Sequence, residues 1–148
     1  MNKRINIEEI EPAGYKSMFA LEQYIATTKV QKTHKELIKI RASQVNGCAF
    51  CIDMHTKDAR KHGETEQRIY LLNAWRETDF FTEEEKVILA LTEEITLISQ
   101  GGLSDETYQK AKAIFDDQYI AQLIMVVVAI NGWNRISIAT QKQPALDK

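Results

Sequence analysis

The chain has 148 residues and a net charge of -2, and 44% of its residues are hydrophobic. This length is most simply one domain, spanning 1–148, and it can bury a core without a metal or disulfide scaffold. The charge argues against a nucleic-acid partner, since binding nucleic acid usually needs a basic face. The N-terminus lacks the apolar segment of a secretory signal, so we expect a cytoplasmic protein.

Helix signals begin close to the N-terminus. Pro12 favours the start of a helix that runs to about Thr28, because proline suits the first helical position. A second helix is expected over 31–45, and the following Asn-Gly pair indicates a turn. A third is expected over 48–62, with Gly63 well placed to end it.

The second half of the chain continues the same pattern. The segment "ETEQRIYLLNAW" (64–75) predicts a fourth helix, and Thr82 with Glu85 forms a capping box for a fifth that ends near Ser99. Ser104 caps a sixth, and an apolar helix is expected over 117–140. Alternation with a period of two is absent over any useful length. We therefore expect an all-α fold, a compact bundle of about six to seven helices.

The last helix contains "LIMVVVAI" and is apolar nearly all round. Polar residues interrupt the apolar segment, so a buried helix is a better interpretation than a membrane span: Gln122, Asn131, Asn134 and Arg135. Such a helix is buried on more than one side. We expect it to form an interface in a homo-oligomer as well as a core, and a central helix of a monomer is the alternative. Its residues Asn131, Trp133, Asn134 and Arg135 either line a site, bridge subunits or, as we expect, serve packing.

The only two cysteines, Cys48 and Cys51, lie three residues apart, and His55 follows one helical turn later. On a helix, the three side chains share one face. Cys48 would lie in the first turn, where unpaired N–H groups and the helix dipole favour a thiolate. His55 can accept a thiol proton or support a thiolate as an imidazolium, and the second thiol can capture a sulfenic acid. The pattern is typical of thiol redox chemistry and leaves open which thiol attacks first.

Other interpretations of the cysteine pair stay open. A zinc site would take its fourth ligand from Glu36, His34 or His62, but structural zinc sites usually have a second ligand pair, which this chain lacks. Two inert buried cysteines are the other alternative. A thioredoxin-like motif fits poorly, because a helix and not a strand precedes the pair. We expect no metal and no cofactor, and we expect His34 and His62 to be ordinary surface residues.

Glu36, twelve positions before Cys48, completes a pattern with Cys51 and His55. The segment "KELIKIRASQVNGCAFCIDMHTKDARKHG" (35–63) resembles the core of the alkylhydroperoxidase D and carboxymuconolactone decarboxylase superfamily. The segment "AINGWNRISIA" is similar to the closing helix of many members. The resemblance implies an alkylhydroperoxidase D-like helical domain that forms a trimer or hexamer. It also implies reduction of alkyl or hydrogen peroxides without a prosthetic group, with a thiol or dithiol, in some cases a protein, as reductant.

The resemblance also implies roles for the four residues. Cys51 would be the peroxidatic cysteine that becomes the sulfenic acid, and Cys48 the more exposed resolving thiol that closes the disulfide. His55 and Glu36 would form the proton relay. Phe50 departs from the best-characterised type, which has a second histidine at this position. Since an apolar ring cannot relay protons, we expect weaker or differently tuned peroxidase activity.

Two other functions remain alternatives. A decarboxylase or lactone-processing enzyme of the same superfamily does not rely on a cysteine pair, so the two thiols argue against it. A redox-sensing binding module would be oxidised without rapid turnover. Replacement of Cys51 by serine separates the three, because only a peroxidase would lose a measurable turnover.

Overall fold

The computed structural model describes residues 3–148, and within this range it contains eight α-helices, two 3-10 helices and no strand. The predicted all-α fold is therefore confirmed for the described part of the chain. Residues 1 and 2 of the predicted domain lie outside the described residues.

The helices follow one another with short connections. The first half of the chain forms α1 (Ile7–Ile10), α2 (Pro12–Thr27), α3 (Lys32–Asn46) and α4 (Ala49–Lys61). The second half forms α5 (Glu66–Leu71), η1 (Leu72–Glu77), α6 (Glu83–Thr96), η2 (Ile98–Gln100), α7 (Asp105–Ile114) and α8 (Asp117–Ala139). Pro12 is the first residue of α2, the Thr82–Glu85 capping box is present, and Ser104 caps α7, as predicted.

The structure differs from the prediction in two places. Helix α1 was not predicted, because a single turn leaves no periodic pattern. The helix expected over 64–75 breaks after α5 and continues as the 3-10 helix η1, in which Ala74 has non-helical angles of φ -120° and ψ 30°. Leu72 and Trp75 of η1 lie on either side of this kink, and both are buried in the same apolar cluster.

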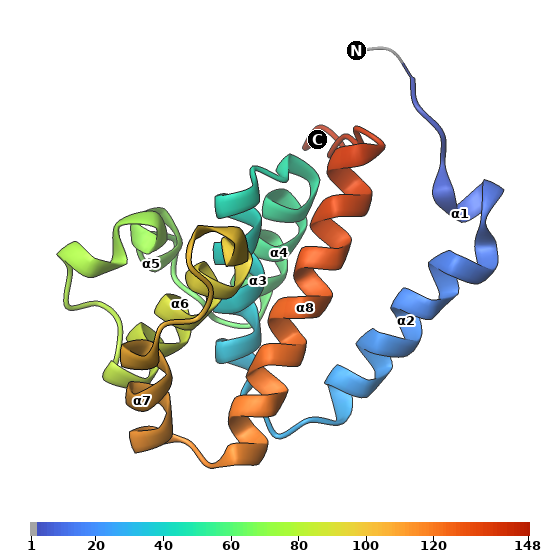
Figure 1. Ribbon diagram of the computed structural model, residues 1–148. Helices are drawn as coiled ribbons and strands as arrows, with labels where there is room; N and C mark the ends of the chain where they lie inside the picture. Colours follow the sequence, from blue (N-terminus) through green and yellow to red (C-terminus); the bar gives the residue numbers. More distant parts are fainter. Residues whose placement is uncertain (1–2) are drawn as a thin grey trace.

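Helices α3 and α8 form the centre of the bundle. Helix α3 packs against α4, α6 and α8, and α8 also contacts α2, α4, α6 and α7. Figure 1 shows α8 running diagonally between α1 and α2 on one side and α3 to α7 on the other side. By length and composition α8 is apolar enough to cross a membrane. Its packing on five other helices is that of a core helix, as the polar interruptions predicted.

The buried apolar residues form two clusters. One joins α8 to α3 and α6 through residues such as Ile38, Ile88 and Leu123. The other joins α3 and α6 to η1 around Leu37 and Trp75. Helix α3 therefore packs into two cores with opposite faces. This packing holds α3, the helix that precedes the cysteines, in place.

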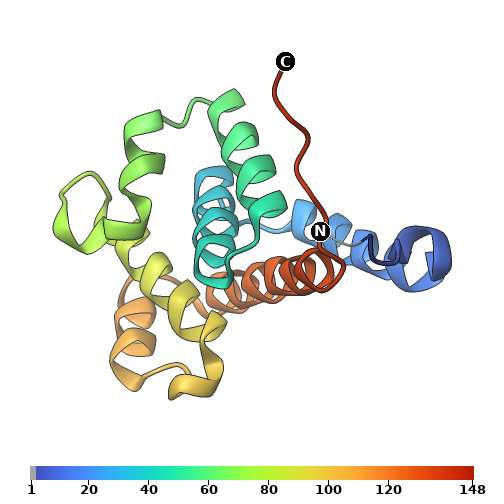
Figure 2. The same ribbon diagram turned by 90° about the horizontal axis from the view of Figure 1, so that it is seen from above.

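Helices α1 and α2, called the N-terminal arm below, lie on the outer side of α8 and project away from the bundle (Figure 1 and Figure 2). Only Ile25 is buried in the whole of α2. The arm approaches α8 closely at Gly132, where an added Cβ would lie 2.9 Å from Met18 Cε. A side chain at Gly132 would therefore require the flexible end of Met18 to shift.

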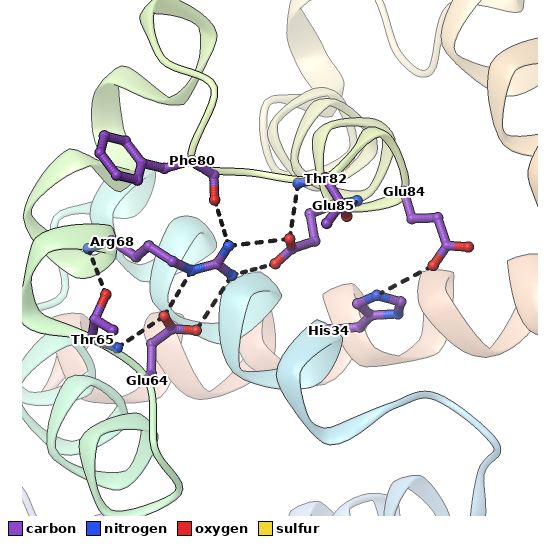
Figure 3. Close-up of polar contacts among 8 residues, drawn as sticks. All are labelled: His34, Glu64, Thr65, Arg68, Phe80, Thr82, Glu84 and Glu85. Carbon is purple, nitrogen blue, oxygen red and sulfur yellow. Dashed lines mark hydrogen bonds and ion pairs between the residues drawn. The ribbon is translucent and has the colours of Figure 1, made fainter.

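Arg68 connects α5 to the start of α6 and is the centre of a group that we call the Arg68 cluster, with Glu64 and Glu85 (Figure 3). Arg68 Nε donates to Glu64 Oε1 at 2.8 Å, and Arg68 also pairs with the Glu85 carboxylate. Burial opposes ionisation of Glu85, but the hydrogen bonds from Arg68 and from the Thr82 backbone outweigh it and lower its pKa. Every member of the cluster therefore has a charged partner.

His34 is buried, so its prediction as a surface histidine was wrong. The first turn of α3 lies against the start of α8, where His34 Nδ1 is 2.7 Å from the Tyr119 hydroxyl. Its other nitrogen lies 3.9 Å from Glu84 (Figure 3). Burial lowers the pKa of His34 despite the attraction of Glu84 and Glu85.

Candidate functional site

Helices α3 and α4 form an antiparallel hairpin that carries both cysteines. The hairpin turns at Gly47, which ends α3 in the left-handed conformation with φ 72°, a region that glycine occupies without strain. Cys48 follows as the N-cap residue of α4, and its N–H donates to the carbonyl of Ser43 at 2.9 Å. The Asn-Gly turn therefore places the two thiols at the start of a helix, as the sequence indicated.

Cys48 and Cys51 form a disulfide, with their Cα atoms 5.3 Å apart. The Cys48 sulfur also accepts a hydrogen bond from the Cys51 backbone N–H at 3.3 Å. Both residues are 1% exposed, so the expected greater exposure of Cys48 is not observed in this disulfide form. The N-cap position turns Cys48 back against α3, which buries it as deeply as its partner.

His55 lies one turn after Cys51 on the same helix. Its Nε2 atom is buried and has no hydrogen-bond partner among the described residues. Burial, and secondarily the positive charge of Lys39, lower the pKa of His55 to about 4. The imidazole is therefore neutral at neutral pH. Of the two roles considered for His55, this environment favours the proton acceptor and not a standing imidazolium.

Glu36 contacts His62 and not His55. Glu36 Oε1 lies 2.9 Å from His62 Nδ1 in this disulfide form, so the Glu36–His55 relay stays a prediction. In an antiparallel hairpin, residues equally far from the turn face each other. Lys39 and His55 are equally far from Gly47, whereas Glu36 lies one turn further back and faces the end of α4. The register of the hairpin therefore gives His55 a lysine neighbour. His62 lies at the surface, as predicted, but it is paired.

A cavity of about 460 Å³ opens between the N-terminal arm, α4 and α8. Cys51 and His55 line it, and Cys48 does not. The arm contributes Tyr15, Phe19 and Glu22, which the sequence analysis missed. These three residues follow an i, i+4, i+7 pattern on α2, so they share one face, and this stripe was the signal available.

The polar residues of α8 divide between the cavity and the core. Trp133 lines the cavity and donates from Nε1 to Glu22 at 3.0 Å. Asn131 and Asn134 instead accept hydrogen bonds from the side chain of Asn46, at 3.0 and 2.9 Å. These bonds tie the end of α3 to α8, so the two asparagines have the packing role that we expected. Arg135 donates to Asn131 on the same helix.

The residues considered as zinc ligands are dispersed. Cys48 and Cys51 are bonded to each other, and His34 is bonded to Tyr119. Over residues 3–148, no three histidine, cysteine, aspartate or glutamate side chains gather as metal ligands. What the structure does bring together is a disulfide, a neutral imidazole and a cavity.

Comparison with known proteins places this hairpin in a family. The sequence profile of the carboxymuconolactone decarboxylase family matches residues 12–94. The uncharacterized protein YdfG of Bacillus subtilis is 50% identical over 145 residues, covering 98% of this chain and 99% of YdfG. The alkyl hydroperoxide reductase AhpD of Hyphomonas neptunium is 40% identical over 45 residues, or 30% of this chain and 25% of that protein.

Among solved structures, one from Agrobacterium tumefaciens is similar over its whole length. It is described as a protein of unknown function and a candidate antioxidant defence protein AhpD. The TM-score is 0.95 at 37% sequence identity, and the match covers 99% of this chain and 100% of that chain. The family match and the structural match both include the α3–α4 hairpin.

Proposed function

Because the chain belongs to the carboxymuconolactone decarboxylase family and has an alkylhydroperoxidase D-like fold, we propose that it is a thiol-dependent peroxidase that reduces alkyl or hydrogen peroxides. One observation carries the proposal. The Cys48–Cys51 pair closes as a disulfide, and of its two residues only Cys51 lines a cavity, beside a neutral histidine. A thiol at a cavity with an adjacent base is the arrangement that nucleophilic attack on a small molecule needs.

The cycle begins with the reduced pair. His55 takes the proton of the Cys51 thiol, and the thiolate attacks the terminal peroxide oxygen. The O–O bond breaks, Cys51 becomes a sulfenic acid, and the departing alkoxide takes the proton from His55. The proton that His55 took from the thiol is thus the one delivered to the alkoxide.

The Cys48 thiol completes the oxidation. Its sulfur attacks the sulfur of the Cys51 sulfenic acid, the disulfide forms, and the hydroxyl group leaves as water with the Cys48 proton. The sum is one peroxide and two thiols converted to one alcohol, one water and one disulfide. A thiol or dithiol reductant then reopens the disulfide by exchange.

The place of Glu36 in this scheme is a prediction from the resemblance. Its carboxylate is bonded to His62, so it would reach His55 only after turning away from that partner or through a water. The direct neighbour of His55 is Lys39, which disfavours the imidazolium. We therefore assign proton transfer to His55 and a supporting role to Glu36.

We also propose that copies of the chain associate through α8 as a homo-oligomer, a trimer or a hexamer. The large apolar side chains of Val128 and Ile138 are exposed on this helix, although it is central to the bundle. Exposed apolar side chains on a core helix favour a contact with a second copy.

The test follows the mass of the reduced protein after addition of tert-butyl hydroperoxide, with and without dithiothreitol. We expect rapid loss of two hydrogens, and continuing consumption of peroxide when the reductant is present. Cys51→Ser should consume no peroxide, whereas Cys48→Ser should be oxidised once, to a sulfenic acid on Cys51. Thiols that stay reduced would refute the peroxidase, and oxidation without turnover would indicate a redox sensor.

A further inference from the structure

The cavity beside Cys51 is much larger than the smallest peroxide needs. Its volume is about 460 Å³, whereas a water-sized molecule occupies about 30 Å³ in the liquid. Pockets for drug-sized organic molecules span roughly 300–1,000 Å³. Hydrogen peroxide would leave most of this cavity empty, so its size favours a substrate with an organic body.

Aromatic side chains form one wall of the cavity. Tyr15 and Phe19 from α2 meet Trp133 from α8, with ring centroids 5.3 to 5.5 Å apart and planes at steep angles to each other. Such edge-to-face clusters offer both ring faces and ring edges to a further aromatic group. Phe50 and Met54 of α4 also line the cavity, so apolar surface continues onto the helix that carries Cys51.

The charges around the cavity cancel. Glu22 accepts from Trp133 Nε1 and lies 3.6 Å from Lys39 Nζ, so its charge already has a partner. The other two charged residues in the lining are Glu8 and Lys142, which have opposite signs. By count, the charges in and beside the lining balance, so no net charge favours an anion or a cation over an uncharged molecule.

From the volume, the aromatic wall and the charge balance, we infer that the cavity binds a compact, uncharged organic molecule with an aromatic ring. The ring lies against Tyr15, Phe19 and Trp133, and its reactive substituent points to Cys51. Phe19 is then a residue that determines specificity. The chemistry rests on the proposed function, in which the substituent is a hydroperoxide, but the binding does not.

The first experiment measures binding without chemistry. Trp133 and Trp75 are the only tryptophans, and Trp75 lies in the other core. A Trp75→Phe variant therefore makes Trp133 the only tryptophan reporter of the cavity. Titration with cumyl alcohol should give a saturable change in its fluorescence, and tert-butanol and benzoate should bind at least about tenfold more weakly. Calorimetric titration of the unchanged protein gives the same comparison if the variant does not fold.

The second experiment uses two matched variants. Phe19 and Phe80 are both 47% exposed, but Phe80 lies beside the Arg68 cluster and does not line the cavity. Phe19→Leu keeps an apolar side chain and removes the ring, so cumyl alcohol should bind about three- to tenfold more weakly. The preference for cumene hydroperoxide over hydrogen peroxide in kcat/KM should fall by the same factor. Phe80→Leu should change neither.

The outcomes separate the two proposals. Saturable binding of cumyl alcohol without any peroxide turnover would refute the peroxidase and support the ring site. Turnover that depends on Cys51, with equal binding of cumyl alcohol and tert-butanol, would support the peroxidase and overturn the ring site. Equal effects of Phe19→Leu and Phe80→Leu would also overturn it.

Discussion

The Arg68 cluster and the Cys51–His55 site are two partly buried polar regions with opposite properties. In the Arg68 cluster, the arginine bonds two carboxylates and the Phe80 carbonyl, and Glu85 also accepts from the Thr82 backbone. In the site, the Nε2 atom of His55 is buried next to a cavity and has no partner within residues 3–148. Both regions remove polar groups from water, but only the first gives each of them a partner.

This difference distinguishes polar groups that stabilise the fold from polar groups that can take part in a reaction. A buried polar group without a partner costs about 1–3 kcal/mol, so folding alone does not favour it. The lone pair of a neutral imidazole that no other group occupies is, however, what a proton acceptor needs. The Arg68 cluster should therefore matter for stability and not for turnover, whereas the site should be needed for turnover.

The largest expected effect tests the structural half of the comparison. Arg68→Met leaves Glu64 and Glu85 without their cation, and breaking a buried ion pair costs about 3–5 kcal/mol. Because Arg68 is partly exposed, we expect the free energy of unfolding to fall by about 3 kcal/mol in urea titrations. Peroxide turnover by the folded variant should stay near that of the unchanged protein.

A surface pair provides the control for Arg68. Lys110 and Glu106 form an exposed pair at 2.9 Å, and Lys110→Met should change the free energy of unfolding by less than about 0.5 kcal/mol. If Arg68→Met is no more destabilising than Lys110→Met, the Arg68 cluster does not stabilise the fold.

A smaller effect is expected from pH and tests the burial of His55. Its pKa is about 4 in the folded, oxidised protein, against an ordinary value of 6.5. Between these values the unfolded chain binds a proton that the folded chain does not, so acidification favours unfolding. The contribution of His55 should be present near neutral pH and should fall by about 2 kcal/mol between about pH 7 and about pH 5.

Other groups titrate in the same range, so the measurement is a difference. The free energy of unfolding is determined across this range for the oxidised protein and for oxidised His55→Gln. The loss of about 2 kcal/mol should be missing from the variant. Parallel curves for the two proteins would mean that His55 is as accessible to protons as in the unfolded chain.

The smallest effect concerns Glu36. Because it contacts His62 and not His55, Glu36→Gln should lower kcat/KM for tert-butyl hydroperoxide by no more than about tenfold. His55→Gln, which removes the proton acceptor itself, should lower it by about a hundredfold. His62→Gln is the matched control, because it also removes the contact between Glu36 and His62 but keeps the Glu36 carboxylate. A loss for Glu36→Gln as large as for His55→Gln would show that the carboxylate turns to His55 in the reduced enzyme.

Local signals in the sequence predicted most of the fold. The N-caps Thr82 and Ser104 and the first helical residue Pro12 mark helix starts by bonds and angles that involve only near neighbours, so the sequence alone predicts them. The break between α5 and η1 accompanies the burial of Leu72 and Trp75 among residues far away in the sequence. The burial of His34 depends on its contact with Tyr119 on α8. Contacts of that kind leave no local pattern.

The candidate site, too, was predicted only where local spacing decides the geometry. The spacing of Cys48, Cys51 and His55 predicted one helical face, and α4 places them on it. The partner of Glu36 depended on the register of two facing helices, which spacing along one helix does not give. The cavity depended on Tyr15 and Phe19, whose arm is far from α4 in the sequence and faces it across the cavity.

The capping of α4 by the Cys48 sulfur has a consequence for the redox balance of the pair. The N-terminus of a helix stabilises negative charge, and the sulfur that accepts the Cys51 N–H becomes anionic only after reduction. A helix end that stabilises the reduced state raises the reduction potential of the couple, as it does for strongly oxidising dithiols. The disulfide then accepts electrons readily, so in the proposed cycle the cap that begins the helix also favours reduction of the pair by a thiol.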